Sequence, residues 1–172
     1  MNNAKGGLPP LCGADLALLR SHLEGLGLPA QVEAITAADA LTVVSAGAGT
    51  GKTWTLAWRF VWTALTREDV RRILTLTFTE KAAAEMRSRI GALFQELEPV
   101  LAGSEELSRR RAEALALLDQ AYISTIHGFS TRVIGEAGLS LPIEPSVRLI
   151  SDPEAEEFWR ELTGALDRLD AD

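Results

Sequence analysis

Residues 46–53, Ala-Gly-Ala-Gly-Thr-Gly-Lys-Thr, restrict the possible folds of this chain more than any other segment. An apolar, β-branched run at residues 41–45 comes directly before them, and a helical pattern at residues 52–65 begins at their end. A glycine-rich turn between a strand and a helix lets backbone N–H groups and the positive end of the helix face a phosphate. The segment therefore predicts a phosphate-binding loop, in which Lys52 reaches the β- and γ-phosphates of a nucleotide and Thr53 binds Mg²⁺.

The loop differs from the strict pattern G-x-x-x-x-G-K-[ST], because Ala46 stands at its first position. A glycine-rich turn with a chance Lys-Thr pair is the alternative interpretation. The strand predicted before the loop and the helix predicted after it favour nucleotide binding. We therefore expect the nucleotide to contact the whole loop, which consists of Ala46, Gly47, Ala48, Gly49, Thr50, Gly51, Lys52 and Thr53.

Short apolar runs alternate with helical patterns along the rest of the chain. Strands are predicted at residues 41–45, 73–77 and 122–126, and helices at about 15–26, 31–38, 52–65, 78–98, 107–120, 129–137 and from 153 onward. We expect Thr77 to cap the fourth helix, Pro99 to end it, and His127-Gly128 to break the last strand. The alternation of strands and helices predicts an α/β fold with a parallel sheet flanked by helices.

Three tryptophans, Trp54, Trp58 and Trp62, recur every four residues on the helix that leaves the loop. This spacing places them on one face of the helix, where they would either pack in the core or stack on a nucleotide base. Core packing is the expectation that we favour, because an apolar stripe on a helix usually faces the protein interior.

The distribution of charge is more informative than its total. The 172-residue chain has a formal net charge of −7, which argues against a protein whose whole surface binds nucleic acid. Residues 52–111 nevertheless hold 11 of the 17 basic side chains, and residues 112–172 hold 12 of the 24 acidic ones. On charge alone we favour solvated helix faces without a ligand as the explanation of this asymmetry, so the function must be inferred from motifs.

Cys12 is the only cysteine, which excludes an intramolecular disulfide and a zinc cluster of thiolates and is typical of a reducing cytoplasm. No apolar run reaches the length of a membrane span, and the amino terminus lacks the apolar core of a signal peptide. We therefore expect a cytoplasmic protein that does not contact a membrane.

The phosphate loop and three further segments, in this order, resemble the UvrD/Rep helicases of superfamily 1 and particularly their RecB/AddA-like branch. Gln31 lies upstream of the loop, residues 76–86 (LTFTEKAAAEM) resemble motif Ia, and residues 123–129 (ISTIHGF) resemble motif Ib. The resemblance implies a RecA-like P-loop NTPase domain, here incomplete and followed by extra helices. It also implies ATP and Mg²⁺ as cofactors, with Gln31 reading the adenine.

By the same resemblance, the turns after the second and third predicted strands contact single-stranded DNA. The implied DNA contacts are Phe78, Thr79, Lys81, Thr125, His127 and Phe129. Aromatic side chains and helix-start N–H groups at strand ends can hold bases and phosphates without sequence preference. The family more often has Asn where this chain has Glu80. Phe78 could instead be a core residue, and His127 could instead be a general base, although no partner for it is evident.

The resemblance covers about residues 31–150 and only the first part of the family's motor. The acidic pair for Mg²⁺ and water and the arginines of a second lobe, which the family uses for hydrolysis, are not evident. Residues 147–152 have the apolar-then-Asp pattern of the acidic strand, but we favour Asp152 as the cap of a helix with Pro153 at its first position. We expect residues 1–138 to belong to the ATP-binding domain and residues 139–172 to begin an inserted helical subdomain.

The first functional hypothesis is the ATP-binding amino-terminal part of a DNA helicase or helicase-nuclease subunit in repair or recombination, working with further domains or subunits. By itself, this chain should bind nucleotide weakly and hydrolyse it poorly. A small P-loop kinase is the alternative, with residues 109–111, three consecutive arginines, clamping the transferred phosphate. A nucleotide-binding interaction module that does not hydrolyse ATP is a third possibility. A truncated sheet would also expose an edge and favour self-association.

Overall fold

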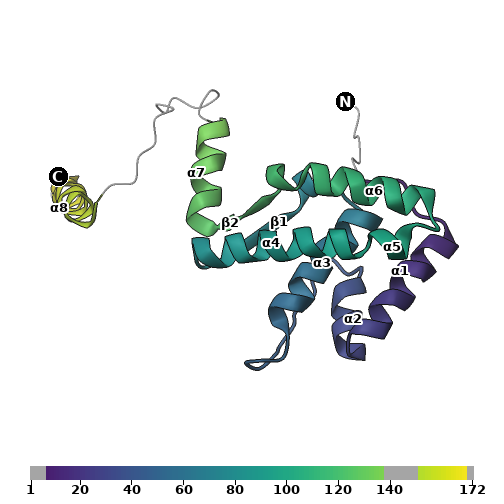
Figure 1. Cartoon of the computed structure of the whole chain (residues 1–172). Coiled ribbons are helices and arrows are strands. Elements are labelled where there is room, and N and C mark those ends of the chain that lie inside the picture. Colours follow the sequence, from purple (N-terminus) through teal and green to yellow (C-terminus); the bar gives the residue numbers. More distant parts are fainter. Residues whose placement is uncertain (1–6, 138–150, 170–172) are drawn as a thin grey trace. The chain divides into compact units, whose positions relative to one another are not determined.

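A computed structural model describes residues 7–137 and 151–169, which divide between Phe129 and Ser130 into two units. Figure 1 shows the helices and strands in chain order. The first unit contains α1 (Gly13–Leu26), α2 (Pro29–Thr36), α3 (Lys52–Thr66), the 3-10 helix η1 (Val70–Arg72), β1 (Leu74–Thr77), α4 (Glu80–Glu96), α5 (Glu98–Leu101), α6 (Glu105–Ala116), the 3-10 helix η2 (Leu118–Gln120), β2 (Tyr122–Thr125) and the start of α7 (Ile126–Ala137). α8 (Asp152–Leu169) belongs to the second unit.

The sheet consists of β1 and β2, which run parallel with Thr75 opposite Ile123. A parallel pair needs a long crossover, and α4, α5 and α6 lie between the two strands in the chain. Side chains alternate between the two faces of the strands, so that Thr75, Ile123 and Thr125 are buried. α4 packs against both strands. The fold is therefore α/β and rich in helix, with a small parallel sheet.

The strand predicted at residues 41–45 is the main error of the sequence-based fold. These residues belong to no helix or strand, and Leu41 and Val43 are 80% and 82% exposed. A strand exists only where its N–H and C=O groups find a partner strand. Among residues 7–137 and 151–169, β1 and β2 pair only with each other, so the apolar run at 41–45 has the composition of a strand without the neighbour that it needs.

Apart from η1 and α5, which the sequence did not predict, the other elements lie close to their predicted positions, and the differences come from the caps. α4 is capped by Thr79, whose Oγ1 accepts a hydrogen bond from Ala82 N at 3.1 Å, and not by Thr77. α4 ends at Glu96, and Pro99 lies inside the next helix, α5, where a proline near the first position needs no N–H partner. Pro99 therefore does not end α4, as its position suggested.

Two further helix starts differ from the predictions. α7 follows β2 without a break, so His127 and Gly128 lie in its first turn and do not separate strand from helix. α8 begins at Asp152, one residue before the predicted position, and Ser151 precedes it with its N–H and hydroxyl donating to Glu154 at 2.8 and 2.9 Å. The apolar run at 147–150 lies outside the described residues.

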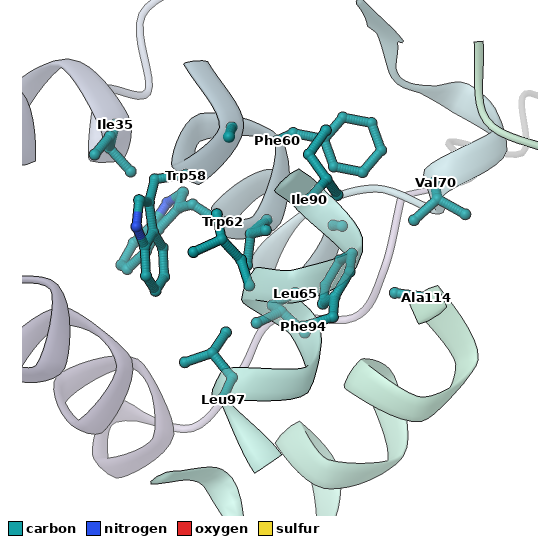
Figure 2. Packing of buried hydrophobic residues seen from close by; sticks show 14 of the residues in the cluster. Ile35, Trp58, Phe60, Trp62, Leu65, Val70, Ile90, Phe94, Leu97 and Ala114 are labelled. Carbon is teal, nitrogen blue, oxygen red and sulfur yellow. The ribbon is translucent and has the colours of Figure 1, made fainter. Parts of the chain in front are cut away.

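The core confirms the predicted role of the tryptophan stripe. Trp58 and Trp62 are buried, and Trp54 packs half-buried against Trp58 with ring centroids 6.0 Å apart. Figure 2 shows how side chains of α2, α3 and α4 meet in this cluster. Its largest fully buried members are Phe94, Leu19, Leu23, Ile35, Leu65, Ile90, Leu97, Leu101 and Leu107. The stripe thus anchors α3, and the loop at its amino end is held by a rigid helix.

Every helix within the described ranges is too short or too polar to cross a lipid bilayer.

Candidate nucleotide and nucleic-acid sites

The predicted phosphate loop leads directly into α3, whose first residue is Lys52. Gly49 and Gly51 adopt left-handed backbone angles, with φ of 77° and 83°. The left-handed backbone favours glycine at position 51, and a Cβ atom there would lie 2.9 Å from Gln31 Nε2 and would displace the end of that side chain. The first-turn N–H groups of α3 have no partner within the helix and point back toward the loop, as phosphate binding requires.

The loop lysine is folded back onto its own loop. Lys52 Nζ donates hydrogen bonds to the carbonyl oxygens of Ala46 at 3.0 Å and of Gly47 at 2.6 Å. Thr50 Oγ1 also donates to Gly47 O, at 2.8 Å. The ammonium group is therefore held at the rim of the loop, where phosphate oxygens could replace the two carbonyl acceptors without a large movement of the side chain.

Gln31 links α2 to the loop through both ends of its amide. Its Oε1 accepts a hydrogen bond from Leu28 N at 2.9 Å, and its Nε2 donates to Thr50 O at 3.1 Å. The sequence predicts a contact between Gln31 and adenine. The structure places this glutamine beside the loop as expected, but its amide groups are bonded to the protein backbone.

A cavity of about 310 Å³ opens between α2 and the loop. Its lining includes Gln31, Ala46, Thr50, Lys52 and Thr55. A volume of this order matches the lower end of the range for small-molecule sites. Most of the residues predicted to bind a nucleotide are thus brought to one cavity.

Two arginines of the α3 region hold α2 beside the loop, a role that no sequence pattern indicates. Arg59 Nη1 donates to the carbonyl oxygens of Ala34, Ile35 and Ala37 at 3.1, 2.9 and 2.6 Å. Arg67 adds hydrogen bonds to Thr36 O and Ala37 O, both at 2.9 Å. Burial, and then the nearby Arg67 charge, lower the pKa of Arg59. The last carbonyls of α2, which have no partner inside the helix, are satisfied in this way.

Thr53 is exposed in the first turn of α3, beside Lys52. Across the described ranges, no three His, Cys, Asp or Glu side chains gather in a group that could hold a metal ion. The role of the Thr53 hydroxyl as a ligand of Mg²⁺ stays a prediction, and such a site needs no carboxylate cluster, because Mg²⁺ at a nucleotide takes most of its ligands from phosphate and water.

The predicted DNA contacts gather at the carboxyl ends of β1 and β2 and at the starts of α4 and α7. Phe78 is 96% exposed, which rules out the alternative that it is a core residue. Thr79 and Lys81 are also exposed, and the Lys81 ammonium lies 4.0 Å from Glu85. An aromatic ring this exposed beside a helix start is suited to stacking on a base.

The remaining predicted DNA contacts lie at the end of β2 and in the first turn of α7. Thr125 is buried, His127 is exposed, and the ring of Phe129 packs edge-on against Tyr122 with centroids 5.8 Å apart. Phe129 thus packs against β2 through Tyr122, and its predicted place beneath a DNA contact stays a prediction. The sequence did not reveal the partner of Glu80, whose Oε1 accepts a hydrogen bond of 2.7 Å from Thr125 Oγ1. A contact between residues 45 positions apart leaves no local sequence signal.

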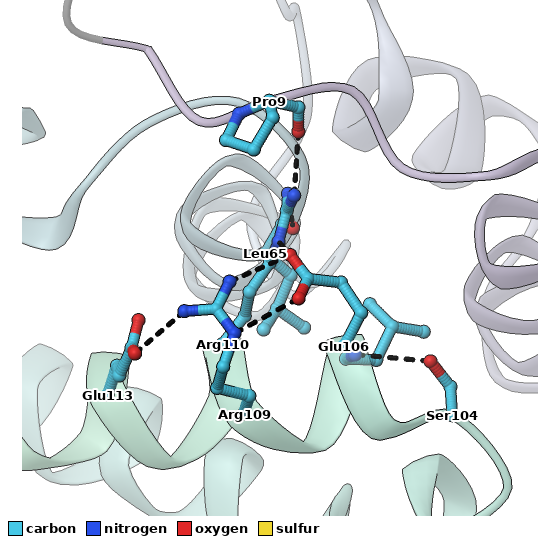
Figure 3. A network of polar contacts seen from close by, with 8 residues as sticks. Pro9, Leu65, Ser104, Glu106, Arg109, Arg110 and Glu113 are labelled. Atoms are coloured by element: carbon cyan, nitrogen blue, oxygen red, sulfur yellow. Dashed lines mark hydrogen bonds and ion pairs between the residues drawn. The ribbon is translucent and has the colours of Figure 1, made fainter.

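The three consecutive arginines of the kinase alternative make hydrogen bonds within the protein, and Figure 3 shows those of Arg109 and Arg110. Arg109 bonds Glu106 and Glu113, at 2.8 and 2.7 Å. Arg110 is 2% exposed and donates to Leu65 O at 3.0 Å. Arg111 Nη1 donates to Phe94 O at 3.3 Å. Arg110 and Arg111 tie α6 to α3 and α4 and are not available as a mobile clamp for a transferred phosphate, whereas Arg109, 49% exposed, pairs with two glutamates of its own helix.

Comparison with known proteins identifies similar sequences. A family model for the UvrD/REP helicase N-terminal domain matches residues 28–171. Several bacterial proteins described as ATP-dependent helicase/nuclease subunits are similar to the chain. The protein from Ruminiclostridium cellulolyticum is 38% identical over 128 residues, covering 73% of this chain and 10% of the relative. Those from Syntrophomonas wolfei and Bacillus cytotoxicus are 41% and 40% identical, over 73% and 77% of this chain and 10% of each relative. The chain thus spans about a tenth of the length of these relatives.

Proposed function

Because the chain belongs to the UvrD/REP helicase family, we propose that it is the ATP-binding amino-terminal part of a DNA helicase or helicase-nuclease subunit. The observation that carries this proposal is the glycine-rich loop at the start of α3, whose Lys52 lines one cavity together with Gln31 of α2. The relatives named above are described as ATP-dependent helicase/nuclease subunits, which agrees with a nucleotide site here. In the longer protein, the cycle of ATP binding and hydrolysis would move single-stranded DNA during repair or recombination.

The loop fits ATP and Mg²⁺ by its donor set. Its two left-handed glycines keep Cβ atoms away from the turn, and the start of α3 offers unpaired N–H groups to phosphate oxygens. Lys52 would bind the β- and γ-phosphates, and the Thr53 hydroxyl would be a ligand of Mg²⁺. The bound metal offsets the negative charge of the phosphates. Ala46, Gly47, Ala48, Gly49, Thr50 and Gly51 would surround them with backbone groups.

Adenine selection is assigned to Gln31. To bind the base, its amide must exchange the Leu28 and Thr50 backbone contacts for the adenine edge. The Thr50 carbonyl belongs to the phosphate loop. Loss of its hydrogen bond to Gln31 when adenine binds would therefore change the contacts of the loop that holds the phosphates.

Single-stranded DNA is the second proposed ligand, bound along the edge formed by Phe78, Thr79, Lys81 and His127, with Phe129 and the buried Thr125 supporting it. The exposed ring of Phe78 supports base stacking, and the two helix starts support phosphate contacts.

We further propose the RecA-like P-loop arrangement for residues 1–138, the start of a helical subdomain for residues 139–172, and additional domains or subunits as partners. Since the proposed substrate is DNA, we place the protein in the cytoplasm.

The proposal is tested by the binding of a fluorescent ATP analogue to the chain and to Lys52→Ala, with Mg²⁺ and with or without a single-stranded oligonucleotide at fixed low salt. We expect Lys52→Ala to lose at least about tenfold in affinity, since it removes a charge-assisted contact to phosphate. Arg20→Ala, which removes one exposed positive charge from α1, is the matched control. Equal affinity of Lys52→Ala and the unaltered chain would refute the nucleotide site, and nucleotide binding that DNA does not affect would favour the interaction module.

A further inference from the structure

A side-chain hydrogen bond joins the turns that follow β1 and β2. Glu80, the first residue of α4, accepts at Oε1 a hydrogen bond of 2.7 Å from the hydroxyl of Thr125, the last residue of β2. The same hydroxyl oxygen accepts a hydrogen bond of 3.0 Å from the N–H of Gly128 in the first turn of α7. Thr125 therefore donates to one helix start and accepts from the other.

The space around this contact is limited. Thr125 is 7% exposed. A Cβ atom at Gly128 would lie 3.3 Å from Thr125 Oγ1 and 3.5 Å from Glu80 Oε1. A side chain at Gly128 would therefore crowd the Thr125 hydroxyl, whereas its contact with the exposed Glu80 would be an ordinary one.

The turn on the β1 side is also braced internally. Thr77 Oγ1 donates to Thr79 O at 3.1 Å, and Thr79 Oγ1 accepts from Ala82 N at the same distance. Phe78 lies between these two threonines and directs its exposed ring to solvent. The braced turn that carries Phe78 is thereby connected, through Glu80, to the turn that carries His127.

We propose that Glu80 is a positioning residue that fixes the two turns relative to each other and so preorganises the DNA-binding edge; this inference rests on the proposed function. A site whose parts are already held in the binding geometry loses less conformational entropy when the ligand binds. The carboxylate acts through its acceptor oxygen and not through its charge, because a negative charge beside DNA would repel phosphates.

The test separates the acceptor from the charge. The affinity of the full chain for a fluorescent oligo-dT is measured by anisotropy at one stated salt concentration for the unaltered protein and for Glu80→Ala, Glu80→Gln, Thr125→Val and Thr125→Ser. We expect Glu80→Ala and Thr125→Val each to weaken binding about fivefold, in the range for loss of one hydrogen bond, and the double variant to be no weaker than either. Glu80→Gln and Thr125→Ser, which keep the acceptor and the donor, should restore affinity. Glu96→Ala removes an exposed carboxylate at the far end of α4 and is the matched control.

The outcomes distinguish this inference from the proposed function. If Glu80→Gln weakens binding as much as Glu80→Ala, or if Glu80→Ala binds as tightly as the unaltered chain, the positioning role is overturned. If the unaltered chain does not bind oligo-dT, the DNA-binding function is refuted. The hydrogen-exchange rate of the Gly128 amide then tests whether Glu80 connects the two turns. Faster exchange in Glu80→Ala but not in Glu80→Gln supports the connection, because Glu80 does not bond that amide itself, and unchanged exchange in both overturns it.

Discussion

At the scale of single residues, Gly51 shows why the phosphate loop is intolerant of side chains. Its φ of 83° is strained for any other residue, and an added Cβ would lie 2.9 Å from Gln31 Nε2. We expect Gly51→Ala to lower the free energy of unfolding by about 1–2 kcal/mol and to weaken ATP-analogue binding, because the loop and Gln31 must separate. Urea denaturation and fluorescence titration measure the two effects.

Gly25→Ala is the control for this prediction. Gly25 lies inside α1, and nothing lies within 4 Å of an added Cβ. Alanine there should stabilise the chain by about 0.5–1 kcal/mol, because it restricts the unfolded backbone at no steric cost. If both alanine variants changed stability in the same direction, the conformation assigned to Gly51 would be wrong.

Glu106 gives the chain a predictable response to acid. Hydrogen bonds from Arg109 and then Arg110 lower the pKa of the Glu106 carboxyl from 4.5 to about 2. The pKa of Glu106 is lower in the folded state than in the unfolded chain. The ionised carboxylate therefore stabilises the fold fully at pH values above its pKa in the unfolded chain, and this stabilisation is lost as the pH falls toward 2. We expect the difference in Tm between the unaltered chain and Glu106→Gln to shrink steadily between about pH 5 and pH 2. Thermal unfolding monitored by circular dichroism measures it, and a difference that does not depend on pH would contradict the prediction.

At the scale of elements, α2 depends on side chains of the α3 region for its position. Arg59 alone donates to three carbonyl oxygens at the end of α2. Arg59→Met keeps most of the side-chain volume but removes these donors, and we expect a loss of about 1–3 kcal/mol in the free energy of unfolding. Since α2 carries Gln31, ATP-analogue affinity should fall as well. Arg20→Met on α1, whose guanidinium pairs with Glu24 across an exposed helix turn, should change neither quantity appreciably.

The three predicted strands show what local sequence can and cannot determine. Residues 41–45, 73–77 and 122–126 share the same apolar, β-branched pattern, and the last two of these runs become β1 and β2. The pattern reports that a segment would pair well, but pairing also depends on a neighbour that another part of the chain supplies. Helices are predicted more reliably because their hydrogen bonds are internal, and only their caps are misplaced by a few residues.

In the candidate sites, too, local features could be predicted from the sequence, and contacts between distant residues could not. The position of the loop and of Lys52 could be predicted because a phosphate loop is a continuous segment with fixed chemistry. The contacts of Gln31 with Thr50, of Arg59 with α2 and of Glu80 with Thr125 join residues that are distant in sequence, and only the fold brings them together. Sequence therefore identifies which residues are chemically suited to a site, but not which side chains hold them in place.

At the scale of the whole molecule, the exposed apolar residues predict self-association. Leu74 and Leu76 on β1 are 45% and 40% exposed, on the face opposite to the buried Thr75. Leu41 and Val43 are exposed more strongly. An uncovered apolar strand face and, in the described part of the chain, unpaired strand edges favour contact with a second copy of the chain. We expect a concentration-dependent increase in mass in size-exclusion chromatography with light scattering.

The variant Leu74→Lys/Leu76→Lys distinguishes the strand face from other contacts. Both positions point away from the core, so the substitutions should leave the fold intact while placing like charges on the face that would meet its copy. We expect this variant to remain a monomer at concentrations where the unaltered chain associates, with an unchanged circular dichroism spectrum. A variant that still associates would move the contact to Leu41 and Val43, and an unaltered chain that is a monodisperse monomer at all concentrations would show that this face does not bind a second copy.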